Sequence, residues 1–184
     1  DILLDKFPKP LKKYTKRIIN LSKNFNTVSI LASIKIKKFF NIKRVDVLNN
    51  VIPDIFFKNY NKKMKKNDSY NFLSVSRFDK NKNIKMLIDV FMENFDKKKA
   101  KLYLLGGGKF TNKFRDYIKK KGFQSKIKLY NFLSRKNTLK FYQKCDCFVM
   151  PSHKETFGLA LFEALLFKKY FITSKHSGFY ELKN

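Results

Sequence analysis

Short apolar runs alternate with amphipathic segments from residue 45 to residue 173. The apolar runs are rich in β-branched and aromatic side chains, which is typical of buried strands. The clearest helical pattern begins at Ile84, because Leu87, Ile88, Phe91 and Phe95 follow it at spacings that place all five on one helix face. Strands are predicted at residues 45–48, 72–76, 102–105, 127–130, 147–150 and 170–173, and helices at 84–95, 111–121, 137–144 and 159–167.

This alternation predicts an α/β fold with a Rossmann-like, doubly wound parallel sheet that is covered by helices on both faces. Sheets of this kind bind ligands at the carboxyl ends of their strands, where the order of the strands reverses. We therefore expect the chemistry of the protein just after residues 76, 105, 130 and 150.

The first 44 residues show a different pattern. They predict a basic helix over 14–25, a strand at 27–31 and a second basic helix at 33–40. Two helices and one strand do not close a core by themselves. We therefore expect residues 1–44 to be the tail of a preceding domain and residues 45–184 to form a second domain.

A formal net charge of +28, from 42 Lys and Arg against 14 Asp and Glu, first suggests a polyanionic partner. Five of the 42 are Arg, the residue that nucleic-acid readers favour, and Lys occurs along the whole chain. Abundant Lys and Phe with few Gly and Pro are typical of an AT-rich genome, which explains the charge without such a partner. A non-catalytic basic module that binds nucleic acid or an anionic membrane is the alternative.

The cysteines and the hydropathy of the chain indicate a cytoplasmic protein. Cys145 and Cys147 lie in an apolar run and are predicted to be buried, inert thiols, as in a reducing compartment. His153 and His176 do not supply a zinc-binding spacing, so no metal site is expected. No apolar stretch approaches the roughly 20 residues that cross a bilayer.

Two strand ends carry residues that suit a phosphate ligand. Arg77 and Lys82 follow the strand at 72–76 and precede a helix, which suits a diphosphate. The glycines of residues 106–108 let backbone approach a ligand, and a simple turn is the alternative there. Because they do not form the G-x-G-x-x-G fingerprint, a dinucleotide-binding dehydrogenase is weakly supported.

The segment 151–163 (PSHKETFGLALFE) is the most informative stretch. Glu155 lies in a loop after a strand, and Glu163 lies about one turn into the next helix. Carboxylates at this spacing can face one crevice, where they are good acceptors for sugar and ribose hydroxyls. The free N–H groups of a helix that opens beside Gly158 can bind a phosphate or sugar oxygen.

Three segments in order resemble retaining glycosyltransferases of the family 4 type. Residues 74–91 (SVSRFDKNKNIKMLIDVF) resemble their segment with Gly-Arg-Leu, then Lys-Gly or Lys-Asn, then an amphipathic helix. Residues 101–110 (KLYLLGGGKF) resemble their strand that ends in a Gly-x-Gly turn. The run from residue 126 to residue 181 is similar to theirs through Tyr142, Asp146, Pro151, Ser152, the paired glutamates and a closing Gly-x-x-Glu. The resemblance covers residues 45–184.

The resemblance implies a GT-B fold, in which the C-terminal domain holds a nucleotide sugar. It implies that Arg77 and Lys82 bind the donor diphosphate and stabilise the leaving group, and that Glu155 contacts hydroxyls of the transferred sugar. These three are the expected catalytic residues. Further expected substrate-binding residues are Gly106 and Gly108 in the turn, Phe132 and Leu133 near the base, Phe157, Gly158 and Leu159 beside the sugar, and Glu163 at the ribose.

The chain departs from the family pattern at four positions. Ser76 replaces the usual Gly before Arg77, and Asn83 stands where Gly is common. Asn50 is followed by Val51, and Gly178 keeps one of two usual glycines. Side chains at Ser76 and Val51 stand where backbone often approaches closely, so the loops there are expected to differ.

The resemblance implies transfer of a glycosyl unit, with retention at the anomeric carbon, from a nucleotide sugar to a glycan or lipid-linked acceptor, without metal or cofactor. Nucleic acid is not an expected partner, whereas the inner face of an anionic membrane is. A sugar phosphorylase of the same fold is disfavoured because no cofactor-anchoring lysine motif is found. We expect the chain to be truncated at both ends, with a stub of the acceptor domain, and to be inactive by itself.

Overall fold

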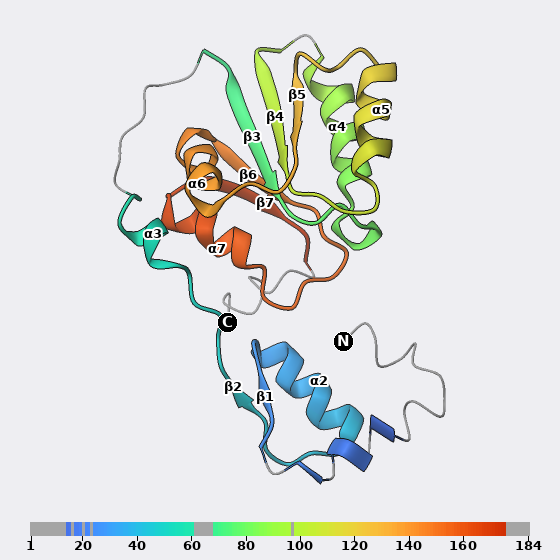
Figure 1. Ribbon diagram of the computed structural model, residues 1–184, viewed down its shortest axis with the longest axis vertical. Coiled ribbons are helices and arrows are strands. Elements are labelled where there is room, and N and C mark those ends of the chain that lie inside the picture. Colours follow the sequence, from blue (N-terminus) through green and yellow to red (C-terminus); the bar gives the residue numbers. More distant parts are fainter. Residues whose placement is uncertain are drawn as a thin grey trace. The chain divides into compact units, whose positions relative to one another are not determined.

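The computed structural model describes residues 14–15, 17–19, 21–22, 24–60, 68–96 and 98–175 (Figure 1). The chain forms two compact units. The described part of the first comprises residues up to Val51 and the segment Lys154–Gly158, and the second comprises Ile52–His153 with the residues from Leu159 onward. The closing Gly-x-x-Glu motif and parts of the basic helix predicted at 14–25 lie outside the described residues.

The first unit contains a parallel strand pair and one helix. Ser29 begins the helix, because its hydroxyl accepts a hydrogen bond from the backbone N–H of Ala32 at 3.3 Å. The strand predicted at 27–31 is therefore wrong beyond Thr27: once Ser29 caps a helix, Ile30 and Leu31 are helical. The elements are β1 (Asn26–Thr27), α2 (Ile30–Phe40) and β2 (Asp46–Val47).

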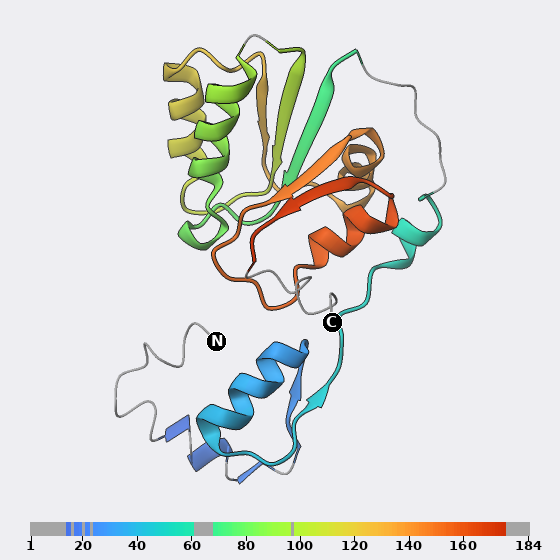
Figure 2. The same ribbon diagram turned by 180° about the vertical axis from the view of Figure 1, so that it is seen from behind.

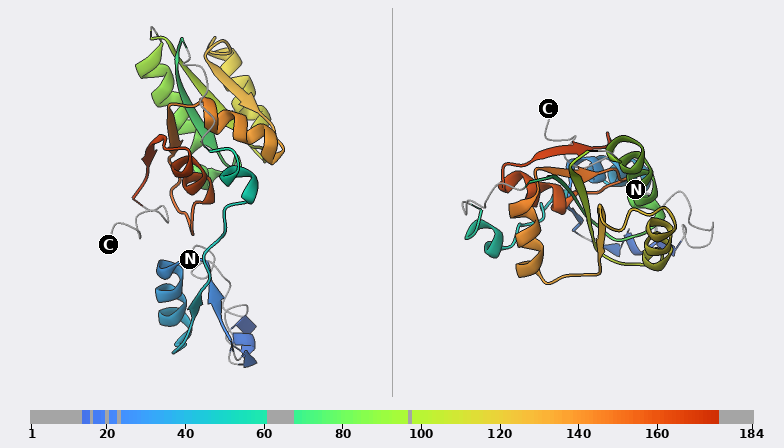
Figure 3. Two further views of the ribbon diagram at one scale, coloured as in Figure 1. Left: turned by 90° about the vertical axis from the view of Figure 1, so that its left-hand side faces the viewer. Right: turned by 90° about the horizontal axis from the view of Figure 1, so that it is seen from above.

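The second unit is built on a five-stranded sheet with the order β5-β4-β3-β6-β7, and every neighbouring pair is parallel. The predicted α/β fold with a doubly wound sheet is confirmed. The strands twist relative to one another, as turned views show (Figure 3). The strands are β3 (Tyr70–Val75), β4 (Ala100–Leu105), β5 (Ile127–Tyr130), β6 (Cys147–Met150) and β7 (Tyr170–Thr173).

Helices cover both faces of this sheet. The helices α4 and α5 lie on one face, and α6 and α7 lie on the other (Figures 1 and 2). The short helix α3, which periodicity does not reveal because it has four residues, packs beside α6 and α7 through Phe56. The helices are α3 (Asp54–Phe57), α4 (Ile84–Phe95), α5 (Thr111–Lys120), α6 (Arg135–Lys144) and α7 (Leu159–Leu166), with a 3₁₀ turn η1 (Lys80–Lys82) before α4.

The strands send alternate side chains into two cores. Leu102 and Leu104 of β4 lie fully buried in the core beneath α4 and α5. Tyr103 between them points the other way and packs on Phe141 of α6, with ring centroids 5.5 Å apart. On that side Tyr142 is completely buried against Phe148 and other rings.

The order of the strands reverses between β3 and β6. From β3 the chain proceeds to β4 and β5 on one side, and it returns to β6 and β7 on the other. Because β3 and β6 run in the same direction, with Phe72 paired to Cys147, their carboxyl ends meet at one edge. This is the place where parallel sheets bind ligands.

The turn after β4 can be tested by two matched glycine substitutions. A Cβ at Gly106 would lie 1.8 Å from the backbone oxygen of Ser76 and φ is +146°, whereas a Cβ at Gly122 would meet nothing within 4 Å at φ +75°. We expect Gly122→Ala to cost about 1–2 kcal/mol of unfolding free energy through backbone strain alone. Gly106→Ala is expected to cost at least about 2 kcal/mol more, because backbone must move.

Urea denaturation of both variants measures these costs. Equal stabilities of the two variants would contradict the close approach of the two loops.

Candidate functional site

The loop after β3 carries the predicted phosphate-binding residues, and one carboxylate organises it. One Asp79 side-chain oxygen accepts hydrogen bonds from the backbone N–H of Asn81 at 2.9 Å and of Lys82 at 3.3 Å. The other oxygen lies 3.4 Å from the guanidinium of Arg77. Asp79 therefore caps η1 and links the two cationic residues. Our sequence analysis missed it, although an Asp before a short polar turn is a capping signal.

Asn83 accounts for one departure from the family pattern. Its backbone is left-handed, with φ 52° and ψ 32°, and it joins η1 to α4. Glycine adopts this conformation without cost, and Asn tolerates it better than most residues do. Asn83 therefore preserves the left-handed backbone turn at which η1 ends and α4 begins, just after Lys82.

The glycine turn after β4 packs directly on the loop after β3. Ser76 N–H donates to the Leu105 carbonyl at 3.0 Å, and Phe78 N–H donates to the Gly107 carbonyl at 2.8 Å. A Cβ at Gly108 would lie 3.1 Å from the Phe78 carbonyl oxygen. The glycines at 106 and 108 are therefore needed for backbone packing, and their contact with a substrate stays a prediction.

A cavity of about 220 Å³ opens at the carboxyl ends of β3 and β4, where the sequence predicts the chemistry. It brings together four of the predicted site residues: Arg77, Gly106, Phe132 and Leu133. Arg77 reaches it with an exposed side chain (75%). Val75, Ser76, Leu105 and Thr138 complete the lining.

Phe132 forms an aromatic wall of this cavity. The residue is 69% exposed, and its ring lies over Gly107, where a Cβ would come within 2.8 Å of a ring carbon. An exposed ring held against backbone offers a flat face for a stacked base or a sugar. The family resemblance implies only that Phe132 lies near the base; the position of its ring comes from the structure.

Two buried hydroxyls lie at the same sheet edge. Within the part of the chain that the structure describes, Ser76 Oγ and Ser152 Oγ have no hydrogen-bond partner. They follow β3 and β6, the two strands at the reversal of strand order. Buried polar groups without partners are rare in folded proteins, and a functional role is one of the explanations for them.

Other motif residues hold the frame of the site. The loops after β3 and β6 are joined by a hydrogen bond from His153 N–H to the Asn81 carbonyl at 2.8 Å. Asp146 accepts a hydrogen bond from the backbone N–H of Asn71, at the start of β3, at 2.8 Å. Tyr142 donates to the Ala160 carbonyl at 3.1 Å and so ties α6 to α7.

Glu163 lies on α7, half-buried next to Tyr142. Burial raises the pKa of its carboxyl, and the Tyr142 hydroxyl and the Arg135 guanidinium oppose that shift. Together with Glu163, the predicted residues that do not line the cavity are Lys82, Gly108, Glu155, Phe157, Gly158 and Leu159.

The segment Lys154–Gly158 groups with the first unit and is described by itself. Glu155 and Phe157 are half-buried there. Gly158 is buried with φ 78°, a conformation that favours glycine, directly before α7 begins at Leu159.

The two cysteines are buried, as predicted. Burial raises the pKa of the Cys145 thiol to about 12 and also raises the pKa of Cys147. Among the described residues, no three His, Cys, Asp or Glu side chains gather in a way that would hold a metal ion. No helix in those residues has the length and apolar character to cross a bilayer.

Residues 56–183 match the model of the family described as glycosyl transferases group 1. The chain belongs to this family. The match confirms the resemblance to glycosyltransferases, whereas the family 4 type and retention stay predictions. It covers the whole of the five-stranded sheet.

A relative agrees with this assignment, and solved structures share the fold. An uncharacterized glycosyltransferase of Methanocaldococcus jannaschii is 31% identical over 126 residues, which cover 68% of this chain and 30% of that protein. A glycosyltransferase structure from Rickettsia africae has a TM-score of 0.75 at 18% identity, covering 94% of this chain and 49% of the other. Anabaena HepE, solved with UDP and glucose, has a TM-score of 0.75 at 17% identity, covering 99% of this chain and 53% of the other.

The likeness to these structures shows a GT-B type fold. The chain spans 30% of the M. jannaschii protein and about half of each of the two solved proteins.

The buried carboxyl of Glu163 predicts a pH-dependent stability. Because its pKa is higher in the folded than in the unfolded chain, its contribution to stability is full at low pH and is lost as the pH rises. We expect Glu163→Gln to raise the unfolding free energy, relative to the original chain, by more at pH 7 than at pH 4. Urea denaturation at both pH values measures the difference.

Glu93→Gln on the exposed face of α4 is the matched control and should show no such difference. A Glu163→Gln effect that is the same at both pH values would show that burial does not penalise the ionised carboxylate.

Proposed function

We propose that the protein transfers a sugar from a nucleoside diphosphate sugar to a glycan or lipid-linked acceptor, with retention at the anomeric carbon. The observation that carries the proposal is the cavity at the ends of β3 and β4, where Arg77 and the ring of Phe132 line one space beside η1. Membership of the glycosyl transferases group 1 family supports the reaction class, and the UDP in the HepE structure supports the donor class.

In this proposal the diphosphate lies between Arg77 and Lys82. Negative charge grows on the diphosphate as its bond to the sugar breaks, so fixed cations stabilise the transition state more than the ground state. Asp79 keeps both residues on one rigid turn. The hydroxyl of Ser76, buried beside Arg77 without a partner, supports a phosphate oxygen as its acceptor.

The nucleoside and the sugar use the remaining predicted residues. The ring of Phe132 stacks on the base, and backbone of Leu133 lies alongside it. Glu163 accepts hydrogen bonds from ribose hydroxyls, and Glu155 accepts them from the transferred sugar. A partly desolvated carboxylate, as at Glu163, binds hydroxyl donors more strongly than an exposed one does.

The bond from the anomeric carbon to the diphosphate breaks and the acceptor oxygen bonds to the same face of that carbon. The departing phosphate takes the acceptor proton, so no side chain acts as general base. We propose that the reaction needs no metal or cofactor, because the sequence contains no Asp-x-Asp motif and the cations of the β3 loop occupy the place of a metal.

Retention is tested on the product itself. With a donor and acceptor pair that supports turnover, the first-formed product should carry the anomeric configuration of the donor. The ¹H coupling constant of its anomeric proton reads this directly, and an inverted configuration would contradict the proposed stereochemistry.

The alternative of a basic polyanion-binding module is not favoured, since family membership accounts for the site. It makes a different prediction for binding. A polyanion module binds in proportion to phosphate number and loses affinity steeply with salt. A donor site retains a nucleoside diphosphate at moderate salt.

Nucleotide binding tests the site assignment. We expect Arg77→Ala and Lys82→Ala each to weaken binding of the preferred nucleoside diphosphate at least tenfold, because a hydrogen bond to a charged group contributes about 1.5–3 kcal/mol. Glu163→Ala should also weaken it. Calorimetric titrations with UDP, GDP and ADP at moderate salt give these affinities.

Lys119→Ala removes an exposed lysine at the end of α5 and is the matched control. It should leave the affinity unchanged. If Arg77→Ala and Glu163→Ala also leave it unchanged, the site assignment is wrong; if the original chain binds none of the three nucleotides, the donor class is wrong.

A further inference from the structure

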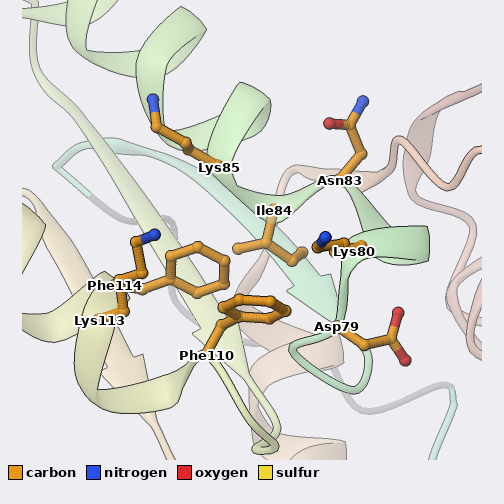
Figure 4. A pocket seen from close by; sticks show the side chains of 8 residues that line it. All are labelled: Asp79, Lys80, Asn83, Ile84, Lys85, Phe110, Lys113 and Phe114. Carbon is orange, nitrogen blue, oxygen red and sulfur yellow. The ribbon is translucent and has the colours of Figure 1, made fainter.

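A second cavity, of about 210 Å³, lies on the α4 and α5 side of the β3 loop (Figure 4). None of the residues that line it lines the cavity of the proposed donor site. Its volume is below the roughly 300 Å³ at which sites for drug-sized ligands begin, so it suits a small molecule. Its lining consists of Asp79, Lys80, Asn83, Ile84, Lys85, Phe110, Lys113 and Phe114.

The centre of this cavity is apolar. Ile84 and Phe114 are buried, and the half-buried ring of Phe110 stacks on Phe114 with centroids 6.0 Å apart and an interplanar angle of 30°. Figure 4 shows the two rings and the Ile84 side chain gathered together. A concave surface of two rings and an aliphatic side chain gains free energy by taking up an apolar group.

The rim of the cavity is cationic and has no free counter-charge. In the described part of the chain, the exposed amines of Lys80 and Lys113 form no ion pair. Lys85 is paired with Asp89 at 2.7 Å. The single carboxylate of the lining, Asp79, is engaged by Arg77 and by the backbone of η1, and Figure 4 shows it turned away from the rings.

We propose that this cavity is a binding site for a small organic phosphate, with the apolar part of the ligand on Ile84, Phe110 and Phe114 and its phosphate between Lys80 and Lys113. Inorganic phosphate uses only the lysines, and a neutral apolar molecule uses only the floor. A phosphate ester with an aromatic or aliphatic body uses both. Lysine binds phosphate as a point charge, and a phosphate dianion has charge enough for both ammonium groups.

The number of lysines at the rim does not support the site by itself, because lysines occur along the whole chain. The argument is their position around an apolar hollow whose one acid is already neutralised. The proposal is also independent of the donor assignment, since Arg77 and Phe132 do not line this cavity.

Phenyl phosphate is the test probe, because it joins a ring to a dianion. Binding is measured on the purified chain by calorimetry and by saturation transfer to the ring protons of the probe. We expect phenyl phosphate to bind at least tenfold more tightly than inorganic phosphate or benzyl alcohol. The double variant Lys80→Ala with Lys113→Ala, and the single variant Phe110→Ala, should each weaken it at least tenfold.

Two matched variants assign the probe to this cavity. Phe132→Ala, which alters the proposed donor site, should leave phenyl phosphate binding unchanged, and UDP should not displace the probe. Phe110→Leu keeps an apolar side chain in the floor and should lose less affinity than Phe110→Ala. Thermal unfolding midpoints confirm that each variant is folded.

Two results would overturn the proposal. One is phenyl phosphate binding that is no tighter than binding of inorganic phosphate. The other is loss of probe binding in Phe132→Ala or in the presence of UDP, which would place the probe in the donor site. Vesicles of phosphatidylcholine with phosphatidic acid distinguish the source of the ester: binding that phenyl phosphate competes away indicates a lipid, and its absence a soluble ester.

Discussion

The carboxylate of Asp79 organises the surroundings of the proposed donor site. It replaces missing hydrogen bonds at the start of η1 and at the same time lies against Arg77. The interaction with Arg77 is weak in itself, because that side chain is exposed and water screens the charge. The hydrogen bonds to backbone are better protected, and they give Lys82 a fixed place in the turn. The same residue lines the cavity on the α4 and α5 side. Asp79 therefore lies between Arg77 of the proposed donor site and the lysines of the second cavity.

Much of the fold could be predicted because it follows from periodicity. The strands β5, β6 and β7 have the predicted bounds, and α4 begins at Ile84, where the apolar pattern starts. The first unit shows why periodicity fails elsewhere. The run at residues 27–31 is apolar enough for a strand, yet the Ser29 hydroxyl caps a helix and decides the local structure. The helix α3 has four residues, so the helical pattern does not repeat within it.

The site was predictable where a motif carries its own chemistry and hidden where it depends on packing. Arg77 follows a strand whose end was expected to bind ligands, and Phe132 was named through the family resemblance; both line the cavity. No pattern predicts that Ser76 Oγ is buried without a partner, because this depends on residues distant in sequence. The glycines after β4 were attributed to ligand approach, yet the structure shows that the neighbouring loop already requires them. Motif residues such as Asp146 support the sheet instead of the ligand.

The backbone contact between Gly106 and Ser76 has a consequence for motion. Two loops whose backbones touch and exchange hydrogen bonds cannot be displaced separately, so the turns after β3 and β4 behave as one body. The loop that carries Phe132 contacts this body through its ring over Gly107, and Gly106 N–H donates to the carbonyl of Tyr130, just before the loop, at 3.1 Å. Any adjustment of the cavity to ligands of different size therefore falls to side chains and to the loop between β5 and α6, while the cationic side of the cavity keeps its shape.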